Sequence, residues 1–372
     1  MACNYTTAYY CAEDLSNLIN VLQYLRALAA ILVVITHLAF KSSIVGHSVF
    51  GGFRIGAAGV DIFFVISGFV MAMIYWRLHD RSPGVFWTKR LIRIFPIYWL
   101  VTSAALLLYL VNPALVNANS GPTSIWRSYT LIPELQARTT QLLIGPAWSL
   151  SFEFYFYTLF AGVFAFSQRS VGLAVAVSVL VLLALGSLSG LAPSYLLTSP
   201  LLLEFAFGIV VFALYTRTAG RFPTAVSALV IGGALLGFTL LNAPGAFVVE
   251  QRWWRAGGPA ALLVLGALSL EQWASRAPSR LWLLLGDASY ALYLVHVFAL
   301  GAASRVFGML GLTRFGPTAE VAYWLVTLLG TIAAGVVVHR YIEMPLAEAV
   351  RRALRRRMPD SKLAPARPGH MP

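Results

Sequence analysis

Charged residues and cysteines are both scarce in this chain, and each scarcity excludes a class of protein. Asp, Glu, Lys and Arg make up only 11% of the 372 residues, whereas soluble domains usually carry about 25%. The two cysteines, Cys3 and Cys11, form neither a C-x-x-C pair nor a Cys/His metal-ligand spacing. The sequence therefore predicts no metal site, no disulfide framework and no ordinary soluble domain.

The short motifs of nucleotide and ester chemistry are also missing. The sequence contains no P-loop, no G-x-G-x-x-G after a strand and no nucleophile elbow, which argues against a nucleotide triphosphatase and a serine hydrolase. The net charge of +13 comes from basic residues between apolar runs and near the C-terminus. No basic face interleaves with stacking aromatics, so this charge does not predict a nucleic-acid partner.

Apolar residues dominate the chain instead. Hydrophobic side chains form 59% of the sequence, and the mean hydropathy is +0.76. Because a membrane-spanning helix needs about 20 apolar residues, we predict an all-α polytopic membrane bundle of about ten transmembrane helices. They are expected near 18–40, 56–76, 94–112, 147–166, 171–190, 199–216, 224–241, 258–274, 286–308 and 321–341.

The polar and basic residues predict the organisation and orientation of this bundle. A polar segment at 1–16 precedes the membrane domain at 17–346, and a basic cytoplasmic tail follows at 347–372. The polar segment lacks the basic start of a cleaved signal peptide, so the first helix is expected to be retained. Most of the 27 Lys and Arg residues fall inside if both termini are cytoplasmic, which predicts that orientation. The tail is also expected to contact anionic lipid.

Two ionisable residues, Arg26 and His37, lie inside the first apolar run at 25–40. Their separation corresponds to about 1100° of helix, so they share one face roughly 16 Å apart along the axis. Ionisable groups at bilayer depth are costly and usually functional. A snorkelling arginine and a histidine bound by a neighbouring helix form the alternative interpretation.

Carboxylates interrupt other apolar runs. Asp61 lies in GVDIFFVISGF at 59–69, and Glu153 lies in PAWSLSFEFY at 146–155. Because a buried carboxylate needs a cation or hydrogen-bond donors, we predict a polar cavity lined by the first, second and fourth helices. Structural ion pairs within the bundle are the alternative, but they would give His37 no role. The later helices also carry polar residues, namely Glu204, which we interpret as structural, Asp287, His296, His339, Arg340 and Glu343.

The run FWTKRLIRIFP at 86–96 begins the third helix on the cytoplasmic side. Arg90 and Arg93 are spaced i,i+3 and share a face, and guanidinium groups suit phosphate. The run therefore predicts a docking site for a phosphorylated cytosolic molecule. An ordinary positive-inside anchor is the alternative.

These runs resemble the acyltransferase-3 family of integral membrane O-acyltransferases. QYLRALAA at 23–30 with His37 is similar to the family's R-x10-H signature. The runs around Asp61, Arg90 and Glu153 resemble its other motifs in the usual order, as do SYALYLVH at 289–296 and YIEMPL at 341–346. The resemblance covers about 17–346, and the first helix is most similar to exopolysaccharide acetyltransferases.

The resemblance implies transfer of an acyl group, most often acetyl, from cytosolic acyl-CoA to a hydroxyl of a sugar or glycan. The acceptor would be, for example, an exopolysaccharide unit, free or lipid-linked, handled at a bacterial plasma membrane without a metal. Arg26 would stabilise the thioester oxygen or hold a CoA phosphate, and Arg90 and Arg93 would grip the nucleotide end. The same chemistry on a macrolide, a lipid or a peptidoglycan sugar stays open. So does a proton-coupled transporter, although no inverted repeat is found.

Under this resemblance His37 is the general base or the acyl carrier. We expect Asp61 or Glu153 to lie near the same depth as His37, within hydrogen-bonding reach of it or of a residue that contacts it. Asp61 is the better candidate to fix the tautomer of the imidazole. Glu153 is the better candidate for acceptor contact. The substrate-binding residues expected around it are Trp148, Ser149, Ser151 and Tyr155.

Overall fold

The computed structural model describes residues 19–44, 53–77, 82–116, 122–132, 141–190, 197–218, 220, 222–242, 248–311 and 316–357. Within these ranges the regular elements are helices, accompanied by an isolated bridge between Thr123 and Gln141. The predicted all-α class is confirmed. The polar segment 1–16 and the tail residues 358–372 lie outside the described residues.

Each of the ten predicted ranges contains a helix. These helices are α2 (Asn20–Ile44), α3 (Gly59–Arg77), α4 (Pro83–Val111), α6 (Trp148–Ala161), α7 (Arg169–Leu188), α8 (Leu202–Thr218), α9 (Thr224–Thr239), α11 (Gly257–Leu268), α14 (Ser289–Met309) and α15 (Gly316–Val338). Shorter or terminal helices lie between and after them, namely α5 (Ile125–Thr130), α10 (Val249–Arg255), α12 (Glu271–Ala274), α13 (Arg280–Asp287) and α16 (Met344–Arg357).

Six stretches of the described chain are long and apolar enough to cross a membrane. They are Asn20–Lys41, Ile55–Arg77, Pro83–Val111, Arg169–Leu188, Ser289–Met309 and Thr318–Leu354. The helices α6, α8, α9 and α11 have 14, 17, 16 and 12 residues, fewer than the about 20 that a straight span needs. The fold is therefore that of an integral membrane protein with six candidate spans.

The third helix begins earlier than the predicted residue 94. Ser82 caps it, because the Ser82 Oγ accepts a hydrogen bond from the Val85 amide at 3.4 Å. Pro83 then occupies the first turn, where its missing amide proton costs nothing. The basic run 86–96 consequently lies inside one long helix that continues through Pro96.

The described parts of the segment between α4 and α6 fold back onto α4. The Tyr98 hydroxyl donates to the Ser128 carbonyl at 2.5 Å, and the Trp99 indole donates to the Tyr129 carbonyl at 2.9 Å. Ser128 also accepts from the Leu143 amide through its Oγ at 2.9 Å. These bonds fix the segment that leads into α6.

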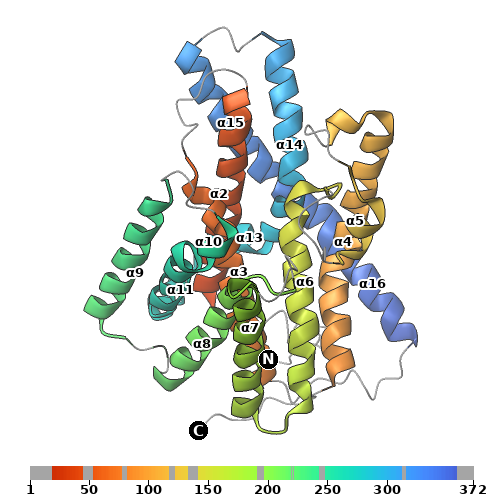
Figure 1. Cartoon of the computed structure of the whole chain (residues 1–372). Coiled ribbons are helices and arrows are strands. Elements are labelled where there is room, and N and C mark those ends of the chain that lie inside the picture. The colour runs from red at the N-terminus through yellow and green to blue at the C-terminus, as the bar shows by residue number, and fades with distance from the viewer. Residues whose placement is uncertain are drawn as a thin grey trace, which may run out of the picture.

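The helix α3 forms the centre of the bundle, in contact with α2, α6, α7, α8 and α11. Two glycines allow α3 and α8 to approach closely. A Cβ added at Gly68 of α3 would lie 2.1 Å from the Phe205 carbonyl oxygen, and a Cβ added at Gly208 of α8 would lie 2.1 Å from the Val65 carbonyl oxygen. Small residues at such crossings are typical of membrane helices. In Figure 1, α9 lies at one edge of the molecule and α4 and α16 at the opposite edge.

The start of α2 is held by the second half of the chain. The Glu271 carboxylate accepts from the Asn20 amide at 3.0 Å and from the Val21 amide at 2.8 Å. Gly286 of α13 approaches α2 so closely that an added Cβ would lie 2.4 Å from the Gln23 carbonyl oxygen. These contacts position the first turn of α2, directly before Arg26.

The last described residues of the chain form a helix. A short π-helix, His339–Glu343, leads from α15 into α16, and the His339 imidazole and the Glu343 carboxylate are 2.8 Å apart within it. The helix α16 packs on α4. The first part of the predicted tail 347–372 is therefore continuous with the bundle.

Candidate functional site

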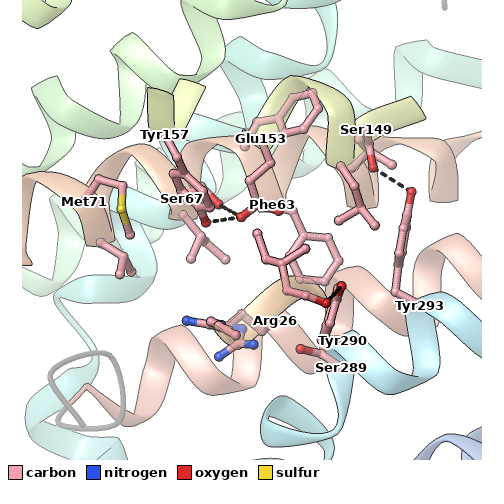
Figure 2. A pocket seen from close by; sticks show the side chains of 17 residues that line it. Arg26, Phe63, Ser67, Met71, Ser149, Glu153, Tyr157, Ser289, Tyr290 and Tyr293 are labelled. Carbon is pink, nitrogen blue, oxygen red and sulfur yellow. Dashed lines mark hydrogen bonds between the residues drawn. The ribbon is translucent and has the colours of Figure 1, made fainter. Parts of the chain in front are cut away.

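A pocket lies between five helices of the bundle (Figure 2). The predicted first, second and fourth helices (α2, α3 and α6) all contribute to it, joined by α4 and α14. The lining residues are Arg26, Val60, Phe63, Phe64, Ile66, Ser67, Val70, Met71, Arg93, Ile94, Ser149, Leu150, Glu153, Tyr157, Ser289, Tyr290 and Tyr293. The pocket thus brings together Arg26, Arg93, Ser149 and Glu153 of the predicted site.

Glu153 is held in this pocket by two hydroxyl groups. Ser67 of α3 donates to the Glu153 Oε1 at 2.8 Å, and Tyr157 donates to the same oxygen from one helical turn further along α6. Figure 2 shows both bonds converging on the carboxylate. Tyr157 was not among the predicted site residues, although its i+4 spacing from Glu153 is the signal that identifies such pairs.

Cations and carboxylates gather at the end of the pocket nearest the start of α2. The Arg26 guanidinium donates to the Gln23 side chain at 3.2 Å and lies near Arg93, Asp287 and Glu343. This end of the pocket can therefore receive an anionic group between two guanidinium groups.

Arg90 and Arg93 have different surroundings, although both lie on α4. Arg93 lines the pocket. Arg90 is buried, with its guanidinium carbon 5.9 Å from the centres of the Phe86 and Tyr157 rings, a distance typical of cation–π contacts. The predicted pair therefore separates into one pocket residue and one residue packed against aromatic rings.

His37 lies outside the pocket lining and is oriented by its own helix. Its Nδ1 is 2.9 Å from the Val33 carbonyl oxygen. Because a carbonyl oxygen can only accept, Nδ1 carries the proton and Nε2 carries a lone pair. A backbone carbonyl, rather than the predicted carboxylate, thus fixes the tautomer among the described residues.

A second histidine faces His37. The rings of His37 and His296 meet edge to face with centroids 4.9 Å apart. His296 is fully buried, its Nδ1 donates to the Tyr293 carbonyl at 2.6 Å, and its Nε2 has no partner among the described residues. The sequence analysis noted His296 within a motif but gave it no role.

Asp61 is bound by an arginine from a distant part of the chain. Arg252 of α10 donates from Nε to Asp61 Oδ1 at 2.8 Å and from Nη2 to Oδ2 at 2.7 Å. Its guanidinium also lies 5.5 Å from the centre of the Trp148 ring. Asp61 is fully buried, and Glu204 lies beside this pair. The predicted hydrogen bond between Asp61 and His37 is not among those of the described residues.

The helix contacts explain why Asp61 and His37 do not meet. Gly59 of α3 packs on the Ala29 backbone, and Gly56 packs on Leu32. Asp61, just beyond Gly59, is therefore level with Ala29 or the turn before it, roughly 12 Å along the axis from His37. The predicted common depth is wrong because α2 extends well past the start of α3.

The remaining predicted residues surround the start of α6. Ser149 lines the pocket, and its Oγ lies 2.7 Å from the Tyr293 hydroxyl. Trp148 supports Arg252, as described above. Ser151 is buried outside the pocket lining, and the Tyr155 hydroxyl donates to the Leu197 carbonyl at 3.2 Å.

The chain matches the family described as an acyltransferase domain over residues 19–340. It is 33% identical to the exopolysaccharide production protein ExoZ of Rhizobium meliloti (strain 1021) over 305 residues, which cover 79% of this chain and 90% of ExoZ. It is 29% identical to the acyltransferase MdmB of Streptomyces mycarofaciens over 367 residues, which cover 86% of this chain and 89% of MdmB. No solved structure matches it.

The protein is therefore a membrane acyltransferase. It belongs to the acyltransferase-3 family, which the sequence motifs predicted.

Proposed function

We propose that this protein transfers an acetyl group from cytosolic acetyl-CoA to a hydroxyl of a carbohydrate acceptor, such as a free or lipid-linked exopolysaccharide unit. The observation that carries the proposal is the pocket itself. It joins two guanidinium groups, which suit a phosphorylated donor, to a carboxylate and hydroxyl groups that suit a sugar. The similarity to ExoZ, a protein of exopolysaccharide production, supports the choice of acceptor.

In this proposal the His37 Nε2 takes the proton of the acceptor hydroxyl. The hydroxyl oxygen attacks the thioester carbonyl carbon, the carbon–sulfur bond breaks, and the imidazolium returns the proton to the CoA thiolate. Arg26 stabilises the negative charge that develops on the thioester oxygen. An acyl-imidazole route through the same nitrogen is the alternative, and an acyl-enzyme trapped without acceptor would identify it.

Glu153 and Ser149 are the proposed acceptor contacts, because both line the pocket and offer hydrogen-bonding groups to sugar hydroxyls. Arg93 is the proposed contact to CoA phosphate. Asp61 supports the site through Arg252, whose guanidinium holds Trp148 in place. Arg90, Trp148, Ser151 and Tyr155 would then shape the site from behind the lining.

We further propose ten spans in a bacterial plasma membrane, with both termini cytoplasmic. Alternating spans would bring Asn20 and Glu271 together at the cytoplasmic side, and Asp61 and Arg252 together at a depth further from it. Both pairs are in contact, which supports the alternation. The loops and the tail would carry the basic excess that favours this orientation.

The test uses purified protein in lipid nanodiscs, acetyl-CoA labelled on the acetyl group, and chemically deacetylated exopolysaccharide oligosaccharides. We expect label on the glycan, released by mild alkali as an O-ester. His37→Ala should reduce transfer by about 10²-fold or more without changing the elution profile of the protein. Transfer to a macrolide or a lipid but not to a glycan would move the proposal to that acceptor.

A further inference from the structure

Phe63 of α3 lies where the pocket meets the hydrophobic cores of the bundle. Its side chain lines the pocket and packs against both hydrophobic cores of the bundle. The second core is built from the parts of α2, α14 and α15 around the histidines and includes Val34, Leu38, Leu292 and Leu300. Along α2, His37 lies between Val34 and Leu38. Along α14, His296 lies between Leu292 and Leu300.

Tyr293 completes the boundary beside Phe63. The two rings meet edge to face with centroids 6.3 Å apart. The Tyr293 hydroxyl donates to the Pro146 carbonyl at 2.6 Å and lies 2.7 Å from the Ser149 Oγ, a contact drawn in Figure 2. Its carbonyl accepts from His296. Tyr293 is thus fixed at both ends, whereas Phe63 is held by packing alone.

The two ends of the pocket differ in chemistry. Arg26 and Arg93 line one end, next to the start of α2 and the early turns of α4. At the other end, α3, α6 and α14 contribute Val60, Phe63, Leu150 and the ring of Tyr293. A donor whose phosphates bind the arginines therefore points its acyl group at Phe63.

We propose that Phe63, supported by Tyr293, is the end wall that limits the length of the transferred acyl group. The proposal rests on the function proposed above. A two-carbon acyl group that meets the wall keeps its carbonyl carbon close to the ring, on the same side as the acceptor contacts proposed at Glu153 and Ser149. Each added methylene pushes the carbonyl carbon back toward the arginines. Phe63 therefore selects short acyl groups for both binding and transfer.

The test measures binding of acetyl-, butyryl- and hexanoyl-CoA to the purified protein in nanodiscs, by competition with labelled acetyl-CoA. For the wild-type protein we expect affinity to fall from acetyl to hexanoyl. Phe63→Ala should raise the affinity for hexanoyl-CoA relative to acetyl-CoA by at least about tenfold, the usual scale for methylenes in an apolar pocket. Phe63→Trp should instead lower the affinity for butyryl-CoA below that of the wild-type protein.

Phe207→Ala is the matched control. Phe207 is also a partly buried phenylalanine, but it lies on α8, packs on Trp253 with ring centroids 6.2 Å apart and does not line the pocket. The Phe207→Ala variant should therefore leave the ratios between the affinities for the three thioesters unchanged. Phe63→Leu serves if the alanine variant does not yield a monodisperse protein, with a smaller shift in the same direction.

The outcomes separate the two proposals. Equal changes in all three affinities on substitution of Phe63 would overturn its role as end wall while leaving the proposed function intact. A wild-type protein that binds none of the three thioesters would overturn the proposed function and this inference together.

Discussion

Arg90 and Arg93 lie one turn apart on α4, yet Arg93 lines the pocket and Arg90 packs on aromatic rings. Arg93→Ala should raise the KM for acetyl-CoA by about 10- to 100-fold, the scale of a lost hydrogen bond to a charged group. Arg90→Ala should change that KM less and lower the unfolding temperature more. Steady-state kinetics over a range of acetyl-CoA concentrations give both constants. Equal KM effects for the two variants would contradict the division.

Arg252 is the cation that holds the buried Asp61 carboxylate. Arg252→Ala should reduce the free energy of unfolding by about 3–5 kcal/mol, because it leaves a buried charge without its partner. The neighbouring Arg255, whose guanidinium lies over the Trp254 ring, is the control. Arg255→Ala should cost only about 0.5–1 kcal/mol, the scale of a partly exposed cation–π contact. Unfolding in mild detergent measures both, and similar losses would argue against a stabilising ion pair.

Several site residues could be predicted from the sequence because polar residues buried in apolar helices need polar partners and therefore tend to lie together. Arg26, Arg93, Ser149 and Glu153 do share the pocket. The partner of Asp61 could not be predicted in this way. Arg252 lies 191 residues away on a short helix. It stands in a polar stretch between two apolar runs, where nothing in the sequence marks it as the partner of a buried carboxylate. The bond from His37 to the Val33 carbonyl was equally hidden, since every residue carries a carbonyl.

Among the elements, α3 and α8 depend on glycine for their contact. Gly68→Ala would place a methyl group 2.1 Å from a backbone carbonyl oxygen, which only a helix displacement can relieve. We expect a loss of about 1–3 kcal/mol or more in unfolding free energy. Gly232→Ala on α9 meets nothing within 4 Å and should be neutral or stabilising by up to about 1 kcal/mol. Thermal unfolding of both variants tests this, and equal stability would place the helices further apart.

The positions of the helices followed from apolar length, whereas their ends required local chemistry. The start of α4 depends on the Ser82 cap, which lies well before the apolar stretch predicted from residue 94. The predicted helix 258–274 is divided into α11 and α12 near Ser269, whose Oγ bonds to the Gly266 carbonyl and to Ser227 of α9. Such a bond between helices has no signature in a hydropathy profile.

For the whole molecule, the proposed orientation can be read from the two native cysteines. Cys3 and Cys11 both precede the first helix, so a membrane-impermeant maleimide should label them only after the cells are permeabilised. In a variant with both cysteines replaced by serine, Trp254→Cys on the exposed face of α10 should be labelled in intact cells. The reverse pattern would invert the bundle, and labelling of both sites in intact cells would contradict the alternation of spans.

The cap on α2 has a consequence for the order of events during synthesis. The Val21 amide is bound by a carboxylate that lies 250 residues later in the chain. At about 5–20 residues per second, a ribosome needs roughly 12–50 s to reach Glu271 after it has made the first helix. During that interval water or lipid headgroups must satisfy the amide groups at the start of α2. The first helix is thus inserted early, but its first turn is bound by Glu271 only late in synthesis. In a chain that ends before Glu271, Arg26 lies on a helix whose first amide groups lack this carboxylate.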